Sequence, residues 1–245
     1  MARLVEGEAQ LVSAPPLIVR LAELVGAEAE REPVEGALRE LLEAYRLTLQ
    51  SDRRHLLEQF RLVDVARKVV GVGSVGTAAW VALLVGVGGD DPLFLQVKEA
   101  QPSVLEPYVG AGVYANNGER VVAGQRLMQA ASDIFLGWTH AQLGVLGQPR
   151  DYYFRQLKDW KGSAVIEGMS DRAMAVYGVM CGWTLARAHA RSGDRIAIAA
   201  YLGKSDSFDR ALASFAETYA DQNERDYATL RAAVDNGRLR ADVGR

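Results

Sequence analysis

Two long helical patterns enclose a strand-rich segment in this chain. From residue 34 to about residue 64, apolar residues recur mostly at intervals of three and four, the period of an amphipathic helix. The gap between Leu49 and Leu56 breaks this period near Ser51, so the segment is predicted to form one helix or two shorter ones. From Met169 onward the apolar period is again helical.

The segment between residues 65 and 162 has the pattern of a small sheet. Short apolar runs with β-branched residues alternate with turns that contain glycine, which is typical of β-hairpins. Strands are predicted over residues 66–70, 77–85 and 93–98, a helix over 121–135, and two further strand-like runs over 134–143 and 151–160. One helix is therefore expected inside an antiparallel sheet.

The order of these patterns, helices, then a small sheet, then helices, predicts an α+β fold. Three parts are expected: an N-terminal helical segment over residues 1–64, a small antiparallel β lobe with a glycine loop over 65–162, and an incomplete helical lobe over 163–245. In the first part, the pair Pro15-Pro16 predicts extended chain before a short helix that ends near Gly26.

Composition narrows the classes of function. Hydrophobic residues make up 49% of the chain and charged residues 24%, so the chain can bury a core. A net charge of −3 argues against a nucleic-acid partner, because phosphate backbones select basic surfaces. The single cysteine, Cys181, excludes an internal disulfide framework, and no His, Cys or acidic cluster has metal-site spacing. The pattern contains neither a signal peptide nor a membrane span, so a cytoplasmic protein without a membrane partner is expected.

Three glycines, Gly71, Gly73 and Gly76, follow directly on the first predicted strand. This spacing can hold a phosphate in a Rossmann turn or in the flap of a kinase-like hairpin, and it can also be a flexible turn. A Rossmann unit needs a second strand before its ribose-binding acid. Asp90 stands 19 residues after Gly71 but follows a glycine-rich turn, and no strand–helix alternation comes after it. The kinase-like interpretation and the simple turn therefore remain open.

The kinase-like interpretation fits the order of the elements. In kinases, the third strand carries a lysine that binds the phosphates, and a carboxylate from the next helix forms an ion pair with that lysine. Lys98 ends the third predicted strand, 22 residues after Gly76. Glu119, at the start of the next helix, is the candidate carboxylate, with Glu106 as an alternative. Ala78 stands where kinases usually carry valine, which weakens the expected contact with adenine. The candidate cofactor-binding residues are Gly71, Gly73, Ser74, Gly76, Lys98 and Glu119.

Several runs carry a family resemblance: "DVARKVVGVGSVGT", "DPLFLQVKEAQPSVLEPY", "RVVAGQRLMQAASDIFLGWT", "YYFRQLKDWKGS", "CGWTLARAHARSGD" and "FAETYADQNERDY". In this order, over roughly residues 60–230, they resemble the bacterial family called domain of unknown function 2252 (DUF2252). That family is similar to the protein-kinase-like and aminoglycoside-phosphotransferase-like superfamily. The resemblance therefore implies a protein-kinase-like fold, in which helices flank a small antiparallel sheet with one embedded helix. It implies no substrate.

The resemblance also implies what this chain lacks. Family members carry "GDxHxxN" and "DFDE" motifs ahead of the region seen here, and motifs of this type supply the base and the magnesium ligands of phosphotransferases. Neither string occurs in this sequence, and the fragment "AHARSGD" holds His189 and Asp194 without a following asparagine. The chain is therefore expected to resemble the C-terminal part of the family only. It is also expected to be inactive without a missing N-terminal segment or a second polypeptide, and its catalytic residues are unknown.

Two functions of different classes follow. The first is the nucleotide-phosphate-holding part of an ATP-dependent, kinase-like phosphotransferase, with ATP and magnesium as cofactors and an unknown small-molecule acceptor. The second is a non-catalytic binding or interaction module, or a truncated gene remnant. The glycines and Lys98 favour the first, and the missing acidic motifs favour the second.

Overall fold

The computed structural model describes residues 2–5, 8–25, 28–69, 76–89, 91–141, 148–157 and 162–241. The chain forms two compact units, residues 1–192 and residues 193–245. The first unit contains the sheet and most of the buried apolar residues.

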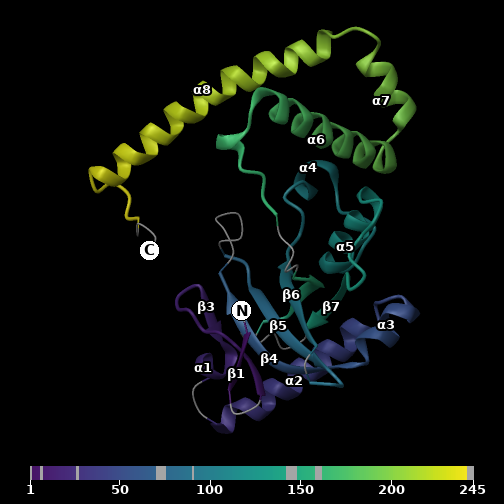
Figure 1. Cartoon of the computed structure of the whole chain (residues 1–245), viewed down its shortest axis with the longest axis vertical. Helices are drawn as coiled ribbons and strands as arrows, with labels where there is room; N and C mark the ends of the chain where they lie inside the picture. Colours follow the sequence, from purple (N-terminus) through teal and green to yellow (C-terminus); the bar gives the residue numbers. More distant parts are fainter. Residues whose placement is uncertain are drawn as a thin grey trace. The chain divides into compact units, whose positions relative to one another are not determined.

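A six-stranded antiparallel sheet forms the centre of the first unit, as Figure 1 shows. Its strands are β3 (Ile18–Arg20), β4 (Phe60–Lys68), β5 (Ala79–Gly86), β6 (Pro92–Ala100), β7 (Gly137–Ala141) and β8 (Arg150–Gln156). They lie in the order β3-β4-β5-β6-β8-β7, so each strand up to β6 pairs with the next one in the chain, and β8 then pairs between β6 and β7. A separate two-stranded sheet pairs β1 (Ala2–Val5) with β2 (Glu8–Leu11).

Both faces of the sheet bury apolar side chains. All eight residues of β5 are buried, and the six from Trp80 to Val85 alternate between two apolar clusters. Trp80, Ala82 and Leu84 belong to the cluster on one face, and Val81 and Leu83 to the cluster on the other. Because alternate side chains of a strand point to opposite faces, a strand covered on both sides has an almost continuous apolar sequence. This explains the run "AWVALLVG".

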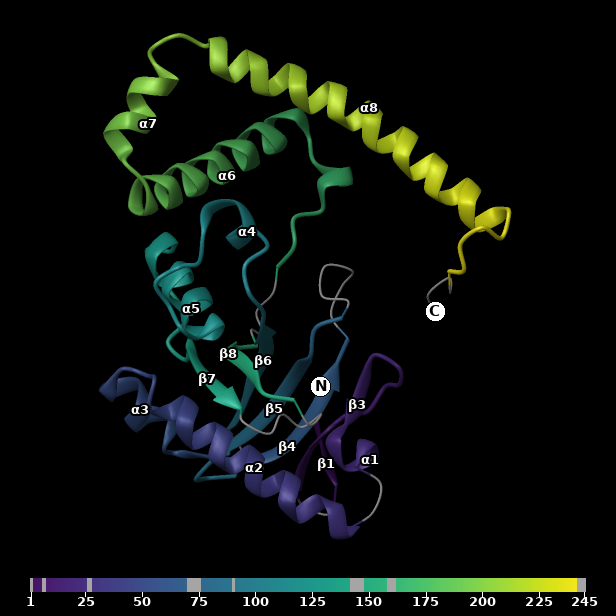
Figure 2. The ribbon, with the colours of Figure 1, turned by 180° about the vertical axis from the view of Figure 1, so that it is seen from behind.

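The helix α2 (Glu28–Arg46) packs on one face, which we call the α2 face. Figure 2 shows it running across the strands. The ring of Tyr45 stacks on Phe154 of β8 with centroids 4.0 Å apart, and the Tyr45 hydroxyl donates to the carbonyl of Phe135 at 2.6 Å. A side chain at Gly137 would meet the Tyr45 ring at 2.7 Å, so glycine allows this close approach of helix and sheet. The short helices α1 (Leu21–Leu24) and α3 (Ser51–Leu57) flank α2 in the chain.

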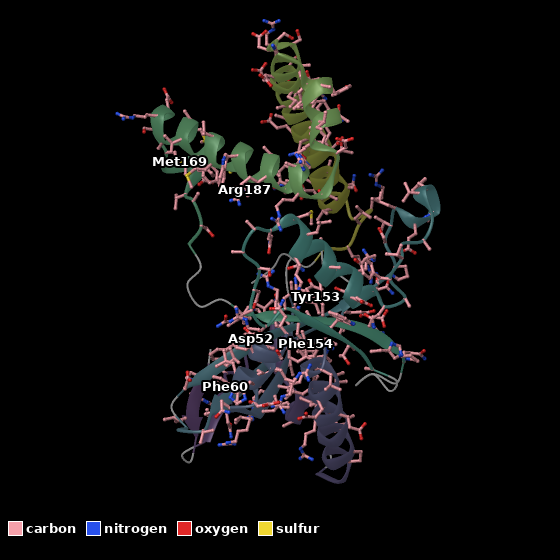
Figure 3. The ribbon with its side chains drawn as sticks, turned by 90° about the vertical axis from the view of Figure 1, so that its right-hand side faces the viewer. Asp52, Phe60, Tyr153, Phe154, Met169 and Arg187 are labelled. Atoms are coloured by element: carbon pink, nitrogen blue, oxygen red, sulfur yellow. The ribbon has the colours of Figure 1, made fainter. Side chains whose placement is uncertain are left out.

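The opposite face, which we call the α5 face, is partly covered by α5 (Asn117–Met128). The helix begins against β8, where a Cβ added to Gly118 would lie 2.3 Å from the carbonyl oxygen of Tyr152. Further along α5, the Arg126 guanidinium lies 5.9 Å from the centre of the Trp138 ring on β7. In Figure 3, the labelled Tyr153 and Phe154 of β8 lie on opposite sides of the sheet.

The remaining helices of the first unit are α4 (Glu106–Val109) and α6 (Asp171–Ser192), with a 3₁₀ turn at Ile166–Gly168. Arg191 near the end of α6 donates from Nε to the carbonyl of Leu127 at 2.8 Å, which caps the C-terminus of α5. The second unit contains α7 (Arg195–Leu202) and α8 (Ser207–Asp235). None of the helices in the described ranges is both long enough and apolar enough to cross a membrane.

The α+β class and the antiparallel sheet with one embedded helix agree with the sequence patterns. The break between helices also occurs, since α2 ends at Arg46 and α3 begins at Ser51. The expectation was wrong near the N-terminus, where three short strands lie within residues 2–20. It also missed the start of β4, because residues 60–64 were assigned to a helix. Pairing with a distant segment decides the strand character of β3 and β4, whereas β1 and β2 pair with each other as a local hairpin. In all of these places a short run does not distinguish helix from strand.

Candidate functional site

Lys98 lies on the central strand β6, where the end of the glycine segment reaches the sheet. Its Cα lies opposite Ala79 of β5 on one side and Tyr153 of β8 on the other. Ala79 follows Gly76 by three residues, and Gly76 has a φ of 87°, a left-handed conformation that favours glycine. The candidate residues Gly71, Gly73 and Ser74 lie outside the described residues.

Strand alternation places the Lys98 side chain on the α5 face. Its neighbours Leu95 and Val97 are buried in the cluster of the α2 face, so Gln96 and Lys98 point to the other side. The half-buried Lys98 therefore shares a face with α5, the helix that carries Glu119.

Glu99, next to Lys98, anchors the chain that returns from the glycine segment. Its Oε2 accepts a hydrogen bond from the Ala78 backbone N–H at 2.9 Å and forms an ion pair with Arg150. Its Oε1 accepts a hydrogen bond from the side-chain amide of Gln101 at 3.2 Å. Burial alone would raise the pKa of Glu99. The hydrogen bonds from Ala78, Gln101 and Arg150 outweigh burial and hold this pKa below its ordinary value. The ionised carboxylate thus ties the start of β5 to β6 and β8.

Asp151 of β8 anchors the first turn of α5 in a similar way. Its Oδ2 accepts from the Asn117 backbone N–H at 2.8 Å and from Asn117 Nδ2 at 2.9 Å. Its Oδ1 accepts from Asn116 Nδ2 at 2.9 Å and lies 2.7 Å from Nδ1 of His140. Burial would raise the pKa of Asp151, but the bonds from His140 and Asn117 lower it below its ordinary value. An ionised Asp151 holds the helix start against the sheet.

The two candidate partners of Lys98 lie in different settings. Glu119 stands in the first turn of α5, and its backbone N–H donates to Oδ1 of the N-cap residue Asn116 at 2.9 Å. Glu106, the alternative, uses its Oε1 to accept from the Ser103 backbone N–H at 3.0 Å. The position of α5 on the same face as Lys98 favours Glu119, and this pairing stays a prediction.

Sequence reasoning missed the anchoring residues. Asp151 lies at the start of a strand-like run, and nothing in the sequence distinguishes it from an acidic side chain exposed to solvent. The Asn116-Asn117 pair before a helical period is a recognisable N-cap signal, and Glu119 follows at the third helical position. That signal predicts where α5 begins. It does not show that a strand 34 residues later supplies the carboxylate.

Two further cations share the face of Lys98. Lys68 of β4 and Arg155 of β8 belong to the same face, because each alternates with residues that point to the α2 face. Among the described residues, no three His, Cys, Asp or Glu side chains are grouped so that they could hold a metal ion. Three cations on one face would complement the charge of an anionic group such as phosphate.

A cavity of considerable size lies elsewhere. It measures about 540 Å³ and is enclosed by α1, α2 and β4, with Leu38, Leu42 and Phe60 among its walls. Some of its rim charges already have partners: Arg46 is paired with Glu43. The cavity holds no residue predicted to bind a cofactor, so size alone does not identify it as the site.

Comparison with known proteins supplies one match. The model of a family described as an uncharacterised protein conserved in bacteria (DUF2252) matches residues 1–233. This span begins well before the runs over roughly residues 60–230 that carry the resemblance, and the match gives no support to the prediction that only the C-terminal part of the family is present. No curated protein and no solved structure matches the chain. The match covers nearly the whole sequence, and the chain belongs to the DUF2252 family.

Proposed function

We propose that this chain holds the phosphates of ATP, bound with magnesium, in a kinase-like phosphotransferase. The observation that carries the proposal is the position of Lys98. It lies opposite Ala79, three residues after Gly76, on the face that α5 and Glu119 also occupy. A lysine on the third strand beside a glycine turn, with a carboxylate on the following helix, is the arrangement that kinases use to hold phosphates.

The two anchored carboxylates support this proposal. Glu99 ties down the residues that follow Gly76, and Asp151 ties down the start of α5. Both segments thereby take defined positions on either side of Lys98. Phosphoryl transfer depends mainly on positioning and charge neutralisation, so a rigid support of this kind is what the chemistry requires.

Calorimetric titration of ATP with magnesium tests the proposal. We expect the wild type to bind and Lys98→Ala to bind at least about tenfold more weakly, since a charge-assisted contact to phosphate is lost. Lys204→Ala is the control, because Lys204 is an exposed lysine in the second unit. Equal heats for the wild type and Lys98→Ala, or no heat for either, would reject the proposal.

The alternative is a non-catalytic binding module. It is favoured by the sequence, which contains neither "GDxHxxN" nor "DFDE". A turnover assay distinguishes the enzyme from the binding module. ATP and magnesium are incubated with the chain, and the ADP released is measured. Binding without ADP release favours the module, and ADP release that Lys98→Ala abolishes favours the enzyme.

A further inference from the structure

The long helix α8 carries a stripe of mostly apolar residues along one face, which we call the α8 stripe. Its members recur at steps of four, three, four, four, four, three and four residues, so they stay on one side of an α-helix. Glu217, Asp221 and Glu224 fall outside this period and lie on the other side of the helix. The members of the stripe are Phe208, Leu212, Phe215, Tyr219, Asn223, Tyr227, Leu230 and Val234.

The middle of the α8 stripe is exposed. Phe215 is 63% exposed and stacks on Tyr219, with ring centroids 5.6 Å apart. Leu212, Tyr227 and Leu230 are also more than half exposed. Because a buried aromatic side chain covers about 150–250 Å², these five residues expose on the order of 500 Å² of mostly apolar surface. Soluble monomers rarely expose a continuous apolar patch larger than a few hundred Å², so the stripe has the character of an interaction surface.

The spacing of the α8 stripe is the same when it is read from either end of the helix. A second copy of α8, turned end for end about a two-fold axis near Asp221, therefore places each member of the stripe beside another member. Leu212 comes beside Leu230 of the second copy, and Phe215 comes beside its Tyr227. An interface between two identical copies has to be self-complementary in this way. The stripe thus meets the geometric condition for pairing with itself.

The one polar member of the stripe supports the same register. In the antiparallel arrangement Asn223 comes beside Tyr219 of the second copy, and a tyrosine hydroxyl can exchange a hydrogen bond with an amide. A single polar residue within an apolar helix–helix contact fixes register and orientation, because other registers place it against apolar side chains.

Charged residues beside the stripe complement each other in this register. Asp209 lies in the first turn of α8 and Arg231 near its end, and the helical period puts both on the same flank of the stripe. Asp209 of each copy therefore comes within one turn of Arg231 of the other. Asp226, which also borders the stripe, already accepts a hydrogen bond from Gln222 at 2.8 Å. The charges, like the apolar spacing, favour a second copy of the same helix as the partner.

We infer that α8 is a dimerisation helix, and that two copies of this chain pair antiparallel through the α8 stripe about a two-fold axis near Asp221. The five exposed members form the apolar core of the contact, and Asp209 and Arg231 lie at its rim. An unrelated protein would not need a stripe that repeats in both directions, whereas a second copy does. The inference uses no residue of the proposed phosphate site and is independent of that proposal.

Sedimentation equilibrium of the full chain tests whether it pairs through α8. At about 100 μM the wild type should have twice the mass of the 26.7 kDa chain, and Phe215→Glu should weaken association at least about tenfold. Trp183→Glu is the matched control, because Trp183 is an aromatic residue of α6 that is 60% exposed, and it should leave association unchanged. A monomeric wild type, or a dimer that Phe215→Glu does not weaken, would overturn the inference and leave the stripe to a partner of another kind.

Disulfide cross-linking tests the register. In a Cys181→Ser background, which has no other cysteine, the double variant Leu212→Cys/Leu230→Cys should form covalent dimers under mild oxidation. Neither single variant should do so, because the two copies of position 212 lie about 27 Å apart along the helices, far beyond the reach of a disulfide. Efficient cross-linking of a single variant would show a different register and overturn the antiparallel pairing.

Charge reversal tests the same register without introducing cysteines. Arg231→Asp should weaken association about fivefold, because it places two acids beside each other at both ends of the contact. The double variant Asp209→Arg/Arg231→Asp should recover most of the loss, since it restores opposite charges. Circular dichroism of each variant shows whether the helix is kept. A double variant that associates no better than Arg231→Asp would contradict the proposed pairing.

Discussion

At the scale of single residues, Asp151 shows how one carboxylate can organise a site that it does not itself form. Its two oxygens accept bonds from Asn116, both nitrogens of Asn117, and His140. The side chain is only 13% exposed, so water cannot easily replace these partners. Hydrogen bonds to a charged group stabilise a structure more than neutral ones do, so this cluster holds the start of α5 firmly against β8.

Asp151→Asn should destabilise the fold by about 2 kcal/mol, because the amide loses the charge and replaces one acceptor with a donor. Urea unfolding followed by circular dichroism measures the change. Glu40→Gln makes the same acid-to-amide change at an exposed position of α2 and should stay within about 0.5 kcal/mol. An equal effect of the two variants would contradict the role given to Asp151.

Stability should fall at acid pH, because the pKa values of both Glu99 and Asp151 are lowered in the folded state. Their ordinary values are 4.5 and 3.8, so the unfolded chain binds protons at a higher pH than the folded chain does. The stabilisation is therefore complete above about pH 4.5 and is lost as the pH falls through the lowered values.

Urea midpoints across this range check the prediction. Between about pH 5 and pH 3 the midpoint of the wild type should drop, and the drop should be smaller in the double variant Glu99→Gln/Asp151→Asn. A drop of the same size in both proteins would show that other groups are responsible.

At the scale of elements, the contact of α5 with β8 depends on one glycine. A Cβ at Gly118 would lie 2.3 Å from the carbonyl oxygen of Tyr152, and backbone atoms cannot give way as a flexible side chain can. The helix therefore begins closer to the sheet than any other residue at this position would allow. This close approach brings Asn117 within reach of Asp151 and places Glu119 on the face of Lys98.

Gly118→Ala should destabilise the fold by about 3 kcal/mol, because the helix must move away from β8. Gly124→Ala, in the middle of the same helix with no atom within 4 Å of the new Cβ, should instead stabilise it by up to about 1 kcal/mol. Thermal unfolding of the two variants distinguishes them by the opposite signs of their shifts. Shifts of the same sign would mean that the close approach to β8 is not limiting.

At the scale of the whole molecule, β5 is the centre of the first unit. It pairs with β4 on one side and with β6 on the other, and all eight of its residues are buried. The sheet formed by β1 and β2 has only two strands, and its Leu4 is 73% exposed. Two-stranded sheets are at best marginally stable by themselves.

Amide hydrogen exchange should therefore be slowest in β5. Its amides should exchange only on global unfolding of the first unit, and those of β1 and β2 should exchange many times faster through local opening. Exchange followed by mass spectrometry on peptides that cover residues 2–11 and 79–86 measures this difference. Similar rates in the two segments would show that the small sheet is part of the same cooperative unit.

Much of this arrangement could be predicted from local pattern. The period of the apolar residues identified α2 and α5, and the β-branched runs identified β5 and β6. The strand character of residues 18–20 and 60–64 was not predicted, because their pairing partners lie far away in the sequence. The hairpin of β1 and β2 is local, but its four-residue strands are too short to show a clear period. The same holds for the site. Lys98 was identified from its place at the end of an apolar strand, whereas the bond of Asp151 to the start of α5 joins residues 34 positions apart and has no local signal.

The sequence by itself determined the α+β class, the embedded helix and the membership of the DUF2252 family, because these depend on local periodicity and on runs of residues that the chain carries in order. Only the tertiary structure decided which side chains share a face and which carboxylates serve as anchors. Register is the physical reason: shifting a strand by one residue would move Lys98 and Arg155 to the other side of the sheet. It is the pairing of β6 with β5 and β8 that gathers the cations beside the end of the glycine segment.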